Sequence, residues 1–180
     1  KERFFGDLNN LSATVGIIKK LSENKTFLAL QGDGYLFYKA DENTVFYKID
    51  CDQVINGNVV STPSYPFVLA CPKSKEIYLS LAPEKKISKY VNGILQLEYK
   101  VPSEDVFSLI IENTEIAGGF SDGLGTFSKD KQRVSDLEIF ELLMSIPNKN
   151  GKFIERIYDN HLVKEKYTHS DDFSCAYLVK

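Results

Sequence analysis

The chain has 180 residues, of which 43% are hydrophobic and 26% charged, so it has the composition and length of one ordinary globular domain. The formal net charge is −3 and no stretch is rich in lysine or arginine. This argues against nucleic acid as the main partner, because binding phosphates needs a concentrated basic face. No apolar run approaches the roughly 20 residues of a membrane-spanning helix and no signal-peptide pattern opens the chain, so we expect a cytoplasmic protein without a membrane partner.

The cysteines are Cys51, Cys71 and Cys175, which are odd in number and far apart in the chain. They match neither a disulfide framework nor the spacing of a zinc knuckle. We therefore expect three reduced thiols, as is usual in the cytosol.

Short apolar runs rich in β-branched and aromatic residues predict strands in the first part of the chain. These runs cover residues 14–18, 26–30, 35–38 and 44–47. Polar turns separate them, which predicts a meander of antiparallel strands. Residues 54–72 contain one glycine and three prolines and predict a loop with at most a short edge strand. Further strands are predicted at residues 76–81, 94–101, 106–111, 115–120 and 173–179.

Two helices are predicted late in the chain. Ser135-Asp136-Leu137-Glu138 is a capping box, and residues 137, 140, 143 and 144 are apolar at helical spacing before Pro147 ends the segment. A second helix is predicted at about residues 152–162. Many antiparallel strands with two late helices predict an α+β fold, in which helices flank an antiparallel β-sandwich, as one domain over residues 1–180.

Acidic residues lie beside small residues at three predicted strand ends. These are Gly32-Asp33-Gly34, Ser121-Asp122-Gly123 and Asp171-Asp172. Carboxylates at strand ends, with glycine allowing close approach of the backbone, suit a site for a hard cation with oxygen ligands. The ordinary interpretation of any single Asp-Gly pair is a turn.

The order of these segments resembles that of the metal-dependent type-2C serine/threonine protein phosphatases. The resemblance rests on Ala13-Thr14 opening one strand and Gly32-Asp33-Gly34 ending the next, then on Phe120-Ser121-Asp122-Gly123-Leu124, and last on Ser170-Asp171-Asp172 before a closing strand. It covers most of the chain.

The resemblance implies a phosphatase that hydrolyses phosphoserine or phosphothreonine in a phosphoprotein substrate, with two or three manganese or magnesium ions between two sheets. Asp122, with Gly123 in the same motif, and Asp171 would be ligands of the metal pair. Asp33 would belong to a further ion that shares Asp122. His169 and Asp172 are candidates for positions just behind the ligands. Several carboxylates are needed because the cations would otherwise repel one another.

The chain departs from the family pattern in two ways. The N-terminal motifs, including an Asp-Gly pair that bridges both metals and an arginine that grips phosphate, have no counterpart, so we expect the chain to be the C-terminal portion of the family fold. Gly34 also replaces the serine that usually follows the aspartate.

Two hypotheses follow from these observations. The first is an active metal-dependent phosphatase, and the second is a catalytically inactive pseudophosphatase that acts as a binding or regulatory module. Retention of Asp33, Asp122 and Asp171 favours the enzyme, because a scaffold does not need three such carboxylates. Oxygen ligands accept both manganese and magnesium. Neither the choice of ion nor the oligomeric state is indicated by the sequence.

Overall fold

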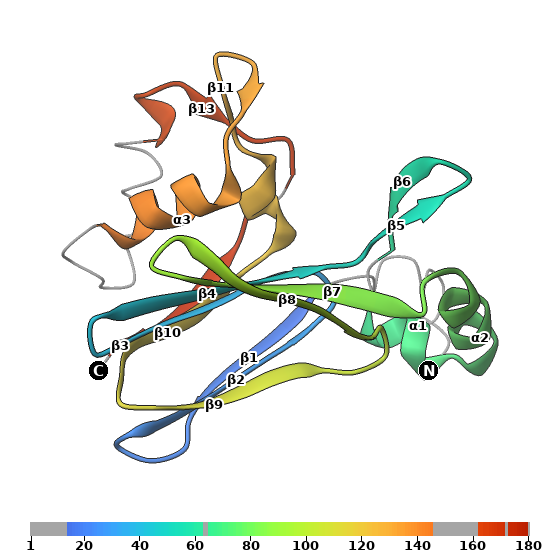
Figure 1. The fold of residues 1–180 in the computed structure, drawn as a ribbon, viewed down its shortest axis with the longest axis horizontal. Coiled ribbons are helices and arrows are strands. Elements are labelled where there is room, and N and C mark those ends of the chain that lie inside the picture. The colour runs from blue at the N-terminus through green and yellow to red at the C-terminus, as the bar shows by residue number, and fades with distance from the viewer. Residues whose placement is uncertain (1–13, 63–64, 146–161, 172, 180) are drawn as a thin grey trace, which may run out of the picture.

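The computed structural model describes residues 14–62, 65–145, 162–171 and 173–179 (Figure 1). The longer strands are β1 (Val15–Lys20), β2 (Lys25–Gln31), β3 (Gly34–Ala40), β4 (Asn43–Asp50), β7 (Glu84–Val91), β8 (Ile94–Pro102), β9 (Phe107–Glu112), β10 (Thr114–Phe120) and β14 (Cys175–Val179). The short strands are β5 (Asp52–Ile55), β6 (Asn58–Ser61), β11 (Ser128–Lys129), β12 (Gln132–Arg133) and β13 (Tyr167–Thr168). The helices are α1 (Pro66–Ala70), α2 (Pro72–Leu81) and α3 (Asp136–Met144), and η3 (Asp122–Thr126) is a 3₁₀ turn.

Two antiparallel sheets form the body of the protein. One has three strands in the order β1-β2-β9, and the other has six in the order β14-β10-β3-β4-β7-β8. The predicted meander is therefore wrong in one respect, because β2 and β3 are consecutive in the chain but belong to different sheets. The chain crosses between the sheets at residues 32–34, where Gly32 and Gly34 have φ values of +107° and +136°. Glycine adopts such a backbone at little cost, so the two glycines on either side of Asp33 make the crossing possible.

The two sheets share an apolar core. Alternate residues of β2 and β9 point toward the six-stranded sheet, as the two-residue period of a strand requires. Leu28 of β2 is fully buried, and Leu36 of β3 and Ile87 of β7 are at most 1% exposed. The other buried members of this cluster are Leu30, Val45, Tyr47, Ile49, Phe107, Ile111 and Ala117. The packing confirms an antiparallel β-sandwich.

The opposite face of the six-stranded sheet is covered by α3 and η3, so the protein has a third layer (Figure 1). Phe140 of α3 packs against Phe37 and Phe46, with ring centroids 5.4 and 4.4 Å away. The helix begins as predicted, because Ser135 Oγ accepts a hydrogen bond from the main-chain nitrogen of Glu138 at 3.2 Å. The α+β class is thus confirmed, and the capped helix α3 flanks the sheet as predicted.

Three sequence predictions about elements are wrong. Residues 76–81 were expected to be a strand but lie in α2, where Pro72 occupies the first turn and fits a helix start. Residues 54–72 form the β5–β6 hairpin and α1 as well as loop. Strand β7 was missed because its sequence is lysine-rich; Lys85 is nevertheless only 1% exposed, and its Nζ donates to the main-chain oxygens of Ser103 and Asp105.

The predicted last strand is confirmed as β14. The second predicted helix, at residues 152–162, lies outside the described residues except for its last position. Within the described part of the chain, no helix is both long enough and apolar enough to cross a membrane.

Candidate functional site

Asp33 and Asp122 line the same pocket, which has a volume of about 210 Å³. Asp33 lies at the crossing from β2 to β3, and Asp122 begins η3 directly after β10. Because β3 and β10 are hydrogen-bonded neighbours, with Tyr35 opposite Phe120, the start of β3 and the end of β10 lie side by side in the six-stranded sheet. The structure therefore brings together two of the aspartates that the sequence singled out.

Asp33 is held from the three-stranded sheet by Thr14. The hydroxyl Oγ1 of Thr14 lies 2.9 Å from the main-chain oxygen of Asp33 and 3.2 Å from its carboxylate oxygen Oδ1. The carboxylate is only 7% exposed. A buried carboxylate with a hydroxyl donor is fixed in orientation, which a cation ligand requires.

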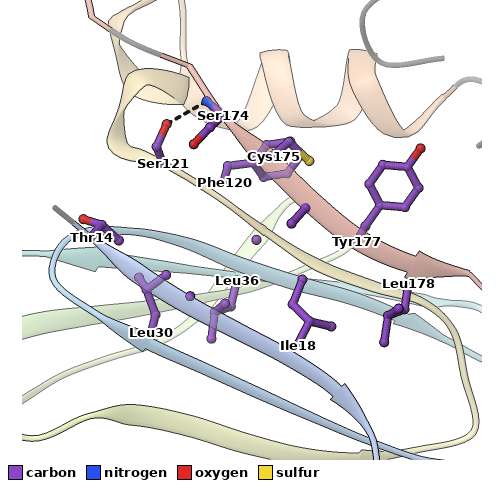
Figure 2. Close-up of a pocket in the computed structure, with 13 residues that line it drawn as sticks. Thr14, Ile18, Leu30, Leu36, Phe120, Ser121, Ser174, Cys175, Tyr177 and Leu178 are labelled. Carbon is purple, nitrogen blue, oxygen red and sulfur yellow. Dashed lines mark hydrogen bonds between the residues drawn. The ribbon is translucent and has the colours of Figure 1, made fainter. Parts of the chain in front are cut away.

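The end of β10 is tied to the segment before β14 by two hydrogen bonds. Ser121 Oγ accepts from the main-chain nitrogen of Ser174 at 3.0 Å (Figure 2), and the main-chain nitrogen of Ser121 donates to the carbonyl of Ser174 at the same distance. Asp122 follows Ser121 directly, and Asp171 lies shortly before Ser174. The pairing thus draws the third predicted aspartate toward the other two.

The pKa values of Asp33 and Asp122 reflect burial and the charges beside them. Burial raises the pKa of Asp33 to about 6, and the negative charge of Asp122 adds to the rise. Burial and the charge of Asp171 likewise raise the pKa of Asp122. Tyr65 lies in the same field, because burial and then Asp33, Asp122 and Asp171 together raise its pKa to about 12. Crowded carboxylates of this kind are characteristic of functional sites.

The donor chemistry fits a hard divalent cation only in part. Carboxylate oxygens are the ligands that manganese and magnesium prefer. Within the described ranges, however, no three histidine, cysteine, aspartate or glutamate side chains converge on a single point where an ion could be held. The described residues therefore match a divalent cation in ligand type and in charge, but they do not by themselves form a complete set of ligands.

The other predicted site residues have defined places. The carbonyl of Gly123 accepts from Thr126 Oγ1 at 2.8 Å, and one lone pair remains for a ligand role. His169 is exposed, and its Nδ1 lies 2.6 Å from the carbonyl oxygen of Asp171, so the ring donates to the main chain beside that aspartate. Asp172 lies outside the described residues.

The basic residues of the pocket were not predicted from the sequence. Lys48 and Arg133 line it together with the two aspartates, and Asp50 and Asp52 do so as well. Lys48 Nζ forms an ion pair with Asp136 Oδ2 at 2.9 Å. The alternation of β4 was an available signal, since Lys48 lies between the buried Tyr47 and Ile49 and must point to the other face. The sequence has no such alternation around Arg133, which reaches the pocket from the short β11–β12 hairpin.

A larger cavity of about 420 Å³ lies on the other side of the Ser121–Ser174 pairing, between β1 and β14 (Figure 2). Its walls are mainly apolar, with Ile18, Leu30, Leu36 and Leu178 projecting toward it. None of the three aspartates lines it. The smaller pocket is therefore the candidate site, because it contains the charged groups.

Gly34 is required by the backbone of this site. A Cβ at this position would lie 2.7 Å from the main-chain oxygen of Phe120, and φ is +136°. We expect Gly34→Ser to lower the free energy of unfolding by about 2–4 kcal/mol, through combined steric overlap and backbone strain. Urea unfolding followed by circular dichroism measures this.

Gly57→Ser is the matched control for that change, since Gly57 also has positive φ (+80°) but nothing lies within 4 Å of its would-be Cβ. It should cost about 1 kcal/mol, the backbone part alone. Equal losses in the two variants would show that position 34 has room for a side chain.

Comparisons with known proteins give no match for this chain: no family model, no curated protein and no solved structure is similar to it at a significant level.

Proposed function

We propose that this chain belongs to a metal-dependent serine/threonine protein phosphatase of the type-2C kind, acting on phosphoserine or phosphothreonine in a phosphoprotein substrate. The observation that supports the proposal is the gathering of Asp33, Asp122 and Asp171 near one end of the sandwich. There, burial and then the charge of Asp122 raise the pKa of Asp33, and burial and then the charge of Asp171 raise the pKa of Asp122. Holding three carboxylates together costs free energy in the absence of a cation, and a divalent ion would remove that cost.

The chain's own residues would act as ligands and as their supports. Asp33, Asp122 and Asp171 would hold two or three manganese or magnesium ions, with the Gly123 carbonyl as a further oxygen donor. Such ions supply an activated water and neutralise charge on the phosphoryl oxygens. Thr14 and the Ser121–Ser174 pair would keep the ligands in place.

The alternative function is a catalytically inactive pseudophosphatase that binds a phosphoprotein or regulatory partner. One observation favours it: the residues that the structure describes do not place three ligand side chains around a common point. The three cysteines form no disulfide. For either function we propose the cytoplasm as the location, since reduced thiols persist there.

Phosphate release from a phosphothreonine peptide separates the two functions. The full chain is titrated with manganese at neutral pH and then treated with excess chelator. The enzyme hypothesis predicts turnover that appears with manganese and disappears with chelator. Absence of turnover in a chain that still binds the peptide would support the binding module.

A further inference from the structure

The candidate pocket is lined by groups of both charges. Lys48 and Arg133 reach its space of about 210 Å³ from β4 and from the hairpin before α3, and the carboxylates that line it are Asp33, Asp50, Asp52 and Asp122. A phosphate ester carries up to two negative charges and cannot approach bare carboxylates. A cation in the same pocket is therefore the group from which such a ligand would gain binding energy.

The two cations of the pocket differ in how much of their charge is free. Lys48 is neutralised by Asp136, whose Oδ2 also accepts from the Tyr35 hydroxyl at 3.0 Å. Arg133 forms no ion pair with any residue in the described ranges, although seven other basic side chains in those ranges do. Within the described ranges, Arg133 is therefore the cation of this pocket that no ion pair engages.

The guanidinium lies beside the 3₁₀ turn that begins with Asp122. Nη2 of Arg133 lies 3.5 Å from the point where a Cβ of Gly125 would be, and the Tyr35 hydroxyl lies 2.6 Å from the same point. Burial raises the pKa of Tyr35, and the positive charge of Arg133 acts in the opposite direction and lowers it. The absence of a side chain at Gly125 thus leaves room for the guanidinium beside the acidic turn.

We propose that Arg133 is the phosphoryl-binding residue of this pocket and binds two oxygens of the phosphorylated side chain, in the space that Asp33 and Asp122 also line. This rests on the proposed function, because it assigns the substrate contact of the same site. The planar guanidinium presents paired N–H donors whose spacing matches two phosphoryl oxygens, which a lysine ammonium cannot reproduce.

Binding of inorganic phosphate to the full chain, by calorimetry with and without saturating manganese, tests this. Arg133→Ala should weaken phosphate binding at least about 10-fold, and Arg133→Lys should recover only part of the loss. Lys131→Asn is the matched control: it removes the same charge from the same hairpin, and asparagine tolerates the φ of +65° at this position. The control should bind phosphate like the unmodified chain.

The outcomes separate this inference from the proposed function. Manganese affinity unchanged in Arg133→Ala, with phosphate affinity reduced, is the expected result. Equal phosphate affinity of Arg133→Ala and the unmodified chain overturns the assignment of Arg133 and leaves the metal site intact. Arg133-dependent phosphate binding in a chain that binds no manganese would support Arg133 and reject the metal-dependent phosphatase.

Discussion

An Asp122→Asn chain is expected to release phosphate from a phosphothreonine peptide at least about 100-fold more slowly than the unmodified chain at saturating manganese. Asp122 is the central carboxylate of the group, since it raises the pKa of Asp33 and is itself acted on by Asp171. An amide at this position keeps the shape and the ability to accept hydrogen bonds but loses the negative charge. The values of kcat and KM, measured together with the thermal unfolding midpoint, separate lost catalysis from lost folding.

Asp130→Asn provides the control for this experiment. Asp130 is exposed on the β11–β12 turn and has φ of +51°, which asparagine also adopts. It removes one negative charge from the same part of the chain without touching the pocket. Activity of Asp122→Asn equal to that of Asp130→Asn would remove Asp122 from the proposed metal site.

Asp33→Asn is expected to stabilise the metal-free protein above neutral pH. The folded pKa of about 6 lies above the ordinary value of 3.8, so the folded state binds more protons than the unfolded state between these values. Stability from this group is complete below about pH 4 and is lost as pH rises through 6. The substitution removes that loss, so the free energy of unfolding should rise by about 1–3 kcal/mol at pH 7.5 and by nothing at pH 4.

With manganese present, the unmodified chain should instead be more stable than Asp33→Asn at pH 7.5. A ligand that binds only the folded state stabilises it by about 2.7 kcal/mol at one hundred times its Kd, and the unmodified chain should gain this while Asp33→Asn gains much less. Urea unfolding at pH 4 and pH 7.5, with and without manganese, measures the four free energies of unfolding of each chain. A metal-free Asp33→Asn chain that is less stable than the unmodified chain at pH 7.5 would mean that Asp33 is a structural acceptor for Thr14 and not a strained ligand.

The parts of the fold that the sequence predicted are those in which local signals agree with tertiary packing. The capping box at Ser135 and the short apolar runs of β2 and β10 are of this kind. Strand β7 was missed because burial of Lys85 is decided by carbonyls of Ser103 and Asp105, which are distant in sequence. Residues 76–81 were mispredicted because exposed Ile77 and Leu81 suggested strand alternation in a helix without a buried face.

The acidic half of the candidate site was predictable and its basic half was not. Asp33 and Asp122 are flagged by neighbouring glycines at strand ends, a local pattern. Lys48 and Arg133 enter the pocket only through the pairing of β3 with β4 and the fold of the hairpin after η3. The crossing of the chain from one sheet to the other at Gly32 was also not predictable from local sequence, because glycine is equally common in turns that join strands of the same sheet.

The most direct test of the proposed metal site is the broadening of backbone amide signals of the ¹⁵N-labelled full chain by substoichiometric manganese. Paramagnetic broadening falls steeply with distance, so it shows where the ion binds without requiring turnover. The proposal predicts that the signals of Asp33, Tyr65, Asp122 and Asp171 disappear first and that magnesium competes with the effect. Broadening that is uniform over the surface, or that begins at exposed acidic residues such as Asp130, would contradict a metal site at this end of the sandwich.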